Sequence, residues 1–163
     1  TTIAVSEPYT VCRLGLKIGT NDNLDVITNG ANDNIDFIED PDGVPVACVA
    51  DIAAGSYTGA GLATAATTAM NTLGICAGAT DPADEYLVTF NEVTGKYTVA
   101  QTGVPGFATF DLPWNSGASA ATSADTALGF AADVADAATY TGAAVTHDIG
   151  AEAEQITIAV VRR

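Results

Sequence analysis

The chain has 163 residues, of which 48% are hydrophobic and 7% aromatic, and it carries a net charge of −15 at pH 7. This length predicts one domain over residues 1–163, large enough to form a core without disulfides or bound metal ions. The negative charge excludes nucleic acid and anionic membranes as partners, because both present phosphates. It also suits a high-salt environment, since salt screens repulsion between carboxylates. An ordinary acidic surface protein is the alternative explanation of the charge.

Neither a membrane span nor a secretory signal is expected from the sequence. No apolar run reaches 18 residues, and the stretch that begins with Thr1 has no basic region followed by a long apolar one. The three cysteines are Cys12, Cys48 and Cys76. No C-x-x-C pattern or Cys/His cluster is present, which argues against a zinc site. Cys12 and Cys48 lie in apolar strand-like runs, where a cysteine is usually a small buried hydrophobe, and one disulfide of unassigned pairing stays open.

Short strands are expected along the first third of the chain. Residues 9–18 alternate between two faces, with Arg13 and Lys17 on the outer one, which predicts a half-buried strand. Two further strands are expected at 24–28 and 34–38. Each follows the same string, Asn-Asp-Asn and then Leu or Ile and Asp, in which Asn and Asp favour turns.

The period then changes from that of a strand to that of a helix. A strand over residues 44–52 is expected to turn Val46, Cys48, Ala50 and Ile52 inward, and the strand region ends in Ala54-Gly55-Ser56-Tyr57-Thr58. A short helix is predicted over about residues 59–73, with Thr58 as the N-cap and Gly74 as the stop. Its inward stripe is Leu62, Ala65, Ala66, Ala69 and Leu73.

The second half of the chain again has the pattern of strands. Residues 85–90 and 96–102 predict a hairpin with Gly95 in the connection. Beyond it we expect a strand that begins at Phe107 and ends at Leu112-Pro113-Trp114, a loop at 115–126, apolar bulk at Leu128-Gly129-Phe130 and a last strand at 155–161. Together these elements predict a mainly β fold, an antiparallel β-sandwich or small barrel with one embedded helix.

Several short motifs follow one another in a fixed order between residues 34 and 130. They are Ile35-Asp36-Phe37, Ala54-Gly55-Ser56-Tyr57-Thr58, Leu62, Tyr86 to Phe90, Thr94 to Val99, Phe110 to Trp114 and Leu128-Gly129-Phe130. This order resembles a group of virion structural proteins from tailed phages and archaeal tailed viruses. Residues 1–30 lie outside the pattern, as a separate N-terminal strand or arm.

The resemblance implies a structural part of a virus particle, either a capsid decoration (cement) protein or a tail component such as a tail-tube or fibre subunit. The implied partners are copies of the chain itself and other virion proteins, such as major capsid or tail subunits. We favour capsid decoration because the chain is small and acidic and has no coiled-coil or fibre repeats. A receptor- or glycan-binding module on the particle surface is the competing interpretation.

No catalytic centre or cofactor site is predicted. His147, the only histidine, stands beside Asp148 in a polar stretch, without a G-x-S-x-G nucleophile motif elsewhere in the chain. A solvated histidine is therefore expected, and the protein is not predicted to be an enzyme. The glycine-rich stretch 55–61 lacks the lysine of a phosphate-binding loop, which favours a tight strand-to-helix turn.

The acid-rich segment 21–42 is the one candidate for a metal site. Its possible calcium ligands are Asp22, Asp25, Asp36, Asp40 and Asp42. Two stretches have the 1-3-5 oxygen spacing of a calcium loop, but Val26 and Phe37 occupy the position that needs glycine, and no Glu stands at position twelve. The favoured interpretation is that these Asn and Asp residues form turns.

Two further groups of residues are candidate contacts. Large aromatic side chains either line a sugar-binding platform or fill the core, and the core is favoured because most other apolar side chains are small. They are Tyr57, Tyr97, Phe107, Phe110 and Trp114. Arg162 and Arg163 are candidates for docking on an acidic neighbouring subunit, against the alternative of a solvated end.

Overall fold

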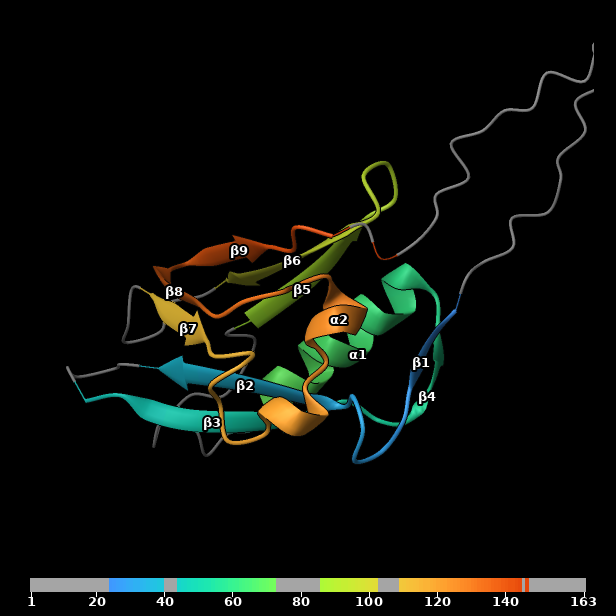
Figure 1. The fold of residues 1–163 in the computed structure, drawn as a ribbon. Coiled ribbons are helices and arrows are strands. Elements are labelled where there is room, and N and C mark those ends of the chain that lie inside the picture. The colour runs from blue at the N-terminus through green and yellow to red at the C-terminus, as the bar shows by residue number, and fades with distance from the viewer. Residues whose placement is uncertain (1–23, 40–43, 73–85, 103–108, 145, 147–163) are drawn as a thin grey trace, which may run out of the picture.

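Two antiparallel sheets, a two-stranded ribbon and one long helix make up the described part of the chain (Figure 1). The computed structural model describes residues 24–39, 44–72, 86–102, 109–144 and 146. One sheet has the order β3-β2-β7-β8, from Val46–Asp51, Asn34–Glu39, Phe110–Leu112 and Val134–Ala137. The other has the order β5-β6-β9, from Tyr86–Asn91, Lys96–Gln101 and Thr139–Thr141. The ribbon pairs β1, Asp25–Ile27, with β4, Gly55–Tyr57.

The core lies between the two sheets and is bridged by a row of aromatic rings. Phe37 of β2 meets Tyr86 of β5 edge to face at 5.2 Å, and Tyr86 meets Phe110 of β7 at the same distance. Phe110 in turn meets Tyr140 of β9 at 5.0 Å. The row therefore alternates between the sheets, and edge-to-face contacts of this kind add to the stabilisation from buried area.

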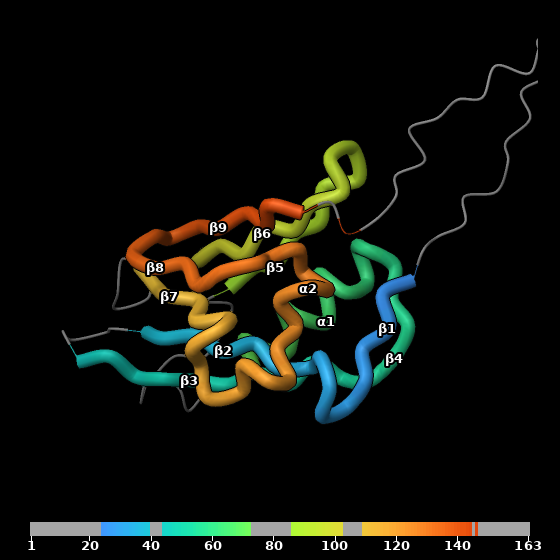
Figure 2. The backbone as a smooth tube through the Cα atoms, in the orientation of Figure 1, coloured from blue at the N-terminus to red at the C-terminus, as the bar shows by residue number. Residues whose placement is uncertain are grey.

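The two sheets also share a corner of the backbone. The chain passes from β8 of one sheet into β9 of the other through Ala138, whose carbonyl accepts a hydrogen bond from the Gln101 N–H at 2.9 Å (Figure 2). The Tyr140 hydroxyl donates to the Phe110 carbonyl at 2.5 Å and accepts from the Ala137 N–H at 2.7 Å. This buried phenol therefore links strands of both sheets.

The long helix α1, Gly59–Thr72, covers the open edge of β5. The Thr67 hydroxyl accepts from the Val88 N–H at 2.8 Å. One turn further on, the Asn71 side chain accepts from the Tyr86 N–H at 2.9 Å and donates to the Tyr86 carbonyl at 2.8 Å. Thr67 and Asn71 thus supply the hydrogen bonds that a neighbouring strand would have made to this edge.

Small residues let α1 approach the sheets closely. Its buried positions are Gly59, Leu62, Ala63, Ala66, Ala69 and Met70. A Cβ on Gly59 would lie 2.5 Å from the Phe90 ring, so only glycine fits where the helix begins. The predicted N-cap is confirmed, because the Thr58 hydroxyl accepts from the Gly61 N–H at 3.2 Å.

The structure confirms a mainly β fold; in the described ranges it has one long helix, and the sheets formed there are not closed into a barrel. The predicted hairpin is confirmed, with Tyr86 opposite Gln101 and Asn91 opposite Lys96. Its connection ends at Gly95, whose φ of +64° favours glycine. The strands at 24–28, 34–38 and 44–52 are present as β1, β2 and β3.

Three details of the predicted elements were wrong. The strand expected to end in Gly55-Ser56-Tyr57-Thr58 is two strands, because β3 ends at Asp51 and β4 leaves to pair with β1. The expected loop 115–126 contains a 3-10 turn, η1 at Ala120–Thr122, and the start of a short helix, α2 at Asp125–Leu128. Strands β8 and β9 were not predicted. The strands expected at 9–18 and 155–161, together with Leu73 and Gly74, lie outside the described residues.

Candidate functional site

Three of the aromatic residues considered for a sugar platform lie in the core. Trp114 and Phe110 are each 1% exposed and Tyr97 is 0% exposed. Trp114 stacks on Phe130 with ring centroids 5.0 Å apart and planes 24° apart. Tyr57 is half-buried in β4, and Phe107 lies outside the described residues. Tyr97, Phe110 and Trp114 therefore fill the interior and do not form an exposed platform.

The calcium candidates that the structure describes have separate partners. Asp25 accepts a hydrogen bond from the Tyr97 hydroxyl at 3.1 Å, and Asp36 accepts one from the Ser119 N–H at 2.7 Å. Asp22, Asp40 and Asp42 lie outside the described residues. Within the described ranges, no three or more His, Cys, Asp or Glu side chains gather in a group able to hold a metal ion.

Among the remaining candidate residues and the cysteines, only Cys48 lies within the described part. His147, Arg162 and Arg163 lie outside it, as do Cys12 and Cys76. Cys48 is 5% exposed and is disulfide-bonded. A buried position was expected for this cysteine, and its disulfide was one of the possibilities that the sequence left open.

Three buried carboxyl groups lie at or just before strand β2, and two of them were not singled out in the sequence. Asp33 and Asp36 are each 5% exposed, and Glu39 is 1% exposed. The Glu39 carboxylate accepts from the Tyr86 hydroxyl at 2.8 Å, which ties β2 to β5 inside the core. Its place two residues after Phe37 on an alternating strand was the available signal, because that register turns both side chains inward.

Asp36 fastens the segment after β7 to the outer face of β2. Its carboxylate accepts from the Ser119 N–H, and it lies so close to Gly117 that a Cβ there would be 2.1 Å from its Oδ2 atom. On the same face, the Thr122 hydroxyl donates to Asn34 at 2.5 Å. Asp36 therefore has a structural role in this fold.

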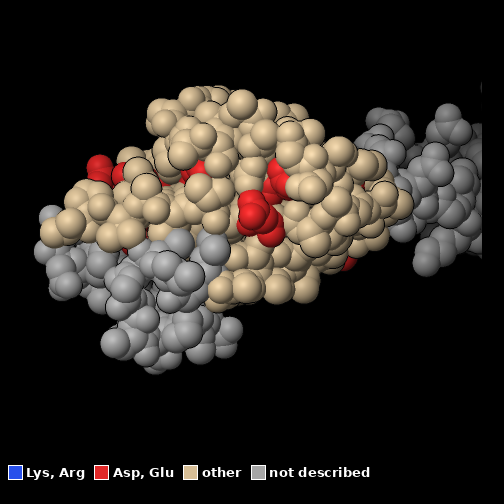
Figure 3. Space-filling view, turned by 90° about the horizontal axis from the view of Figure 1, so that it is seen from below, with Lys and Arg blue, Asp and Glu red and all other residues tan. Residues whose placement is uncertain are grey.

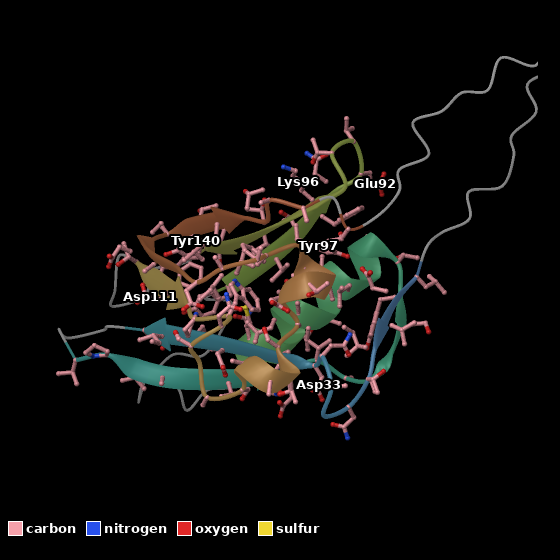
Figure 4. All side chains as sticks on the ribbon, in the orientation of Figure 1. Asp33, Glu92, Lys96, Tyr97, Asp111 and Tyr140 are labelled. Atoms are coloured by element: carbon pink, nitrogen blue, oxygen red, sulfur yellow. The ribbon has the colours of Figure 1, made fainter. Side chains whose placement is uncertain are left out.

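Asp33 borders a hollow of about 460 Å³ between the ribbon and the four-stranded sheet. Two carboxyl-bearing residues line it, Asp33 and Asp51, together with Asn29, Gly30, Asn34, Ile52, Ala53 and Ala54. Figure 4 shows Asp33 at the turn that leads from β1 into β2. The face seen in Figure 3 carries acidic side chains and no Lys or Arg among the described residues.

Two buried tyrosines predict a loss of stability in alkali. Burial, followed by the neighbouring Asp25 carboxylate, raises the pKa of Tyr97 well above its usual range, and burial raises the pKa of Tyr140. When the pKa of a tyrosine is raised in the folded state, the resulting stabilisation is fully present below the unfolded pKa of about 10. This stabilisation is lost as the pH rises toward the folded pKa. Urea unfolding at increasing pH should therefore show a falling free energy of unfolding above about pH 10.

The tyrosine variants separate this effect from general alkaline unfolding. In the Tyr97→Phe/Tyr140→Phe protein, the free energy of unfolding should be lower at neutral pH, because buried hydrogen bonds are lost. Its decline above about pH 10 should be shallower, since neither side chain can ionise. An equally steep decline in the variant would mean that other groups cause the alkaline loss.

No helix in the described part of the chain has the length and apolar character needed to cross a membrane.

The geometry gathers buried carboxyl groups and core aromatics, with one hollow at the junction of the ribbon and the sheet. Comparison of the chain with protein-family models, with curated proteins and with solved structures found no match.

Proposed function

We propose that the protein is a virion structural protein, and that it acts as a capsid decoration protein which stabilises the particle through contacts between subunits. The observation that carries the proposal is the burial of the large aromatic side chains, because exposed rings were the feature that would have favoured a glycan-binding module. Trp114, Tyr97 and Phe110 are each at most 1% exposed. The ordered motifs between residues 34 and 130 supply the link to virions.

The polar contacts of the described part support an assembly role over catalysis. Several polar side chains, the buried Asp36 among them, join structural elements: Thr67 and Asn71 bind the edge of β5, and Asp36 holds the segment that contains Ser119. Large apolar side chains that remain exposed include Leu24 at 49% and Val26 at 59% in and beside the ribbon. Such residues offer contact area to a neighbouring subunit.

The proposed mechanism is self-association in a symmetric homo-oligomer that contacts the particle surface. At a net charge of −15, repulsion between subunits opposes association, and salt weakens that repulsion. Association should therefore strengthen between low and high salt, which fits a virion that meets saline surroundings.

Sedimentation velocity of the purified chain tests this function. We expect a discrete oligomer whose population grows with protein and salt concentration, and no change in sedimentation when sugars are added. A monomer at every concentration that binds sugars on a glycan array would favour the receptor-binding alternative. A long open polymer would favour a tail-tube or fibre component, since head-to-tail contacts that do not close produce filaments.

A further inference from the structure

The outer face of the three-stranded sheet is left uncovered by the described part of the chain. Because side chains alternate along a strand, every second residue of β5, β6 and β9 points away from the core. The outward set is Leu87, Thr89 and Asn91 of β5, Lys96, Thr98 and Ala100 of β6, and Thr139 and Thr141 of β9. All of them are exposed or half-buried, and we call this set the threonine face. In Figure 1 it forms the upper surface of the molecule.

The centre of the threonine face is a row of threonines in register. Thr98 lies directly opposite Thr89 on one side and Thr141 on the other. The hydroxyls of Thr98 and Thr141 hydrogen-bond to each other at 2.9 Å, and β6 is paired along both of its edges. Burial of this centre against another surface would therefore leave few polar groups without a partner, which keeps the cost of desolvation low.

The threonine face has no acidic residue, although the chain is strongly acidic. The described ranges contain ten Asp and Glu residues and one basic residue, Lys96. Lys96 belongs to the threonine face, whereas Glu92 lies beyond the end of β5, in the turn of the hairpin. Figure 4 shows Lys96 on the side of the molecule opposite to Asp33, and the view from below in Figure 3 shows acidic side chains. The charge is therefore unevenly distributed between the two sides.

This distribution of charge decides which surfaces of two copies can meet. Contacts through the acidic sides bring like charges together, at a net charge of −15 for each chain. When two threonine faces meet, the acidic sides point away from each other. Packed sheets are about 10 Å apart, so the acidic sides of such a four-layered pair are separated by several Debye lengths of about 8 Å each. Repulsion between the copies is then largely screened.

We propose that the threonine face is the contact between two copies of this chain, which pair through it about a two-fold axis. The inference rests on the proposed self-association and names the surface responsible for it. Leu87, which is 43% exposed, and Ala100 add apolar area beside the threonine methyl groups. In a two-fold contact the same patch serves both copies, which the acid-free face allows.

The size of the threonine face predicts a weak contact. Three strands of up to six residues cover about 300 Å² in projection, whereas a standard interface buries about 800 Å² on each partner. The pair should therefore form at high protein concentration, and salt should increase its population by screening the remaining repulsion.

Charged substitutions at the centre of the face test the proposal by sedimentation velocity at fixed ionic strength. Thr98→Glu and Thr98→Lys change the net charge in opposite directions, but each places like charges against each other across the axis. Both should raise the dissociation constant of the pair about tenfold or more. Mixing the two variants should restore pairing, because opposite charges then face each other.

Thr68→Glu and Thr68→Lys are the matched controls. Thr68 lies on the exposed side of α1, and its hydroxyl also makes one hydrogen bond of 2.9 Å, to the Thr64 carbonyl. These variants change the net charge by the same amounts, and they should leave the dissociation constant close to that of the unchanged protein.

Three results would overturn the inference. Association in both Thr98 variants at the level of the Thr68 variants would show that another surface joins the copies, and the proposed self-association would stand. Weakened pairing that mixing does not restore would mean a contact without two-fold symmetry. An unchanged chain that stays monomeric at every protein and salt concentration would contradict the proposed self-association as well. If the Thr98 variants do not fold, Thr89→Glu and Thr89→Lys, at an exposed position of the same row, decide the question.

Discussion

Gly117→Ala is expected to lower the free energy of unfolding by about 3 kcal/mol or more, the sum of overpacking and a disturbed buried hydrogen bond. An added Cβ would lie 2.1 Å from Asp36 Oδ2 and 2.6 Å from Asp36 Cβ. The new Cβ at position 117 and the Cβ of Asp36 are both fixed by the backbone, so a change in the Asp36 side-chain conformation cannot relieve the clash between them. The segment around Gly117 must lift from β2, which weakens the bond between the Ser119 N–H and Asp36.

Gly30→Ala is the matched control for this substitution. Gly30 has a φ of +71°, yet no atom lies within 4 Å of the position that its Cβ would take. Its cost is therefore backbone strain alone, about 1 kcal/mol. Urea unfolding of both variants should rank Gly117→Ala as clearly the more damaging. Equal losses would mean that Asp36 does not hold the covering segment against β2.

Removal of the hydrogen bonds between α1 and β5 is the second large effect. Thr67→Val preserves shape but leaves the buried Val88 N–H without its acceptor, and we expect a loss of about 1–3 kcal/mol. Asn71→Leu removes both bonds to Tyr86 and should cost at least as much. Because the same changes expose the edge of β5 to other chains, the variants should also aggregate more readily.

Thr68→Val is the control for the helix substitutions. The Thr68 hydroxyl is exposed and donates only to the Thr64 carbonyl within the helix, at 2.9 Å. Its replacement should change the free energy of unfolding by no more than about 0.5 kcal/mol. If Thr67→Val and Thr68→Val have the same stability, the side chains of α1 do not act as a substitute strand.

Local sequence patterns predicted the elements whose two faces differ most in hydrophobicity. The alternation of 34–38, 44–52 and 85–102 was sufficient, because each strand has one side in the core. The helix was recognisable from its changed period and from Thr58. In contrast, β8 has the sequence Val-Ala-Asp-Ala, in which Ala and Asp are depleted in strands, and β9 has only three residues. They form strands because Tyr140 enters the core and its hydroxyl binds Phe110 and Ala137.

The break between β3 and β4 shows a second limit of sequence patterns. Residues 46–53 contain no glycine, proline or asparagine, so a single strand region was expected to continue as far as the turn that begins at Gly55. The bond from the Ile52 N–H to the Asp33 carbonyl is the last one that continues the pairing of β3 with β2. The chain then pairs β4 with β1, a partner that lies far away in the sequence.

The same limit applies to the candidate sites. The sequence indicated calcium spacing around Asp25 and Asp36, whereas the structure gives each of these carboxylates its own hydrogen-bond partner, Tyr97 and Ser119. No spacing rule predicts these partners, because they lie far away in the sequence. The burial of Trp114, by comparison, was foreseeable, since a core of small residues needs large aromatic filler.

Quantitative mass spectrometry of purified virus particles tests the proposed virion function most directly. The account predicts that the chain copurifies with particles at a copy number comparable with that of the major capsid protein. A few copies per particle would move the chain from capsid decoration to the tail. Its absence from particles, in cells that express it, would contradict a structural role in the virion.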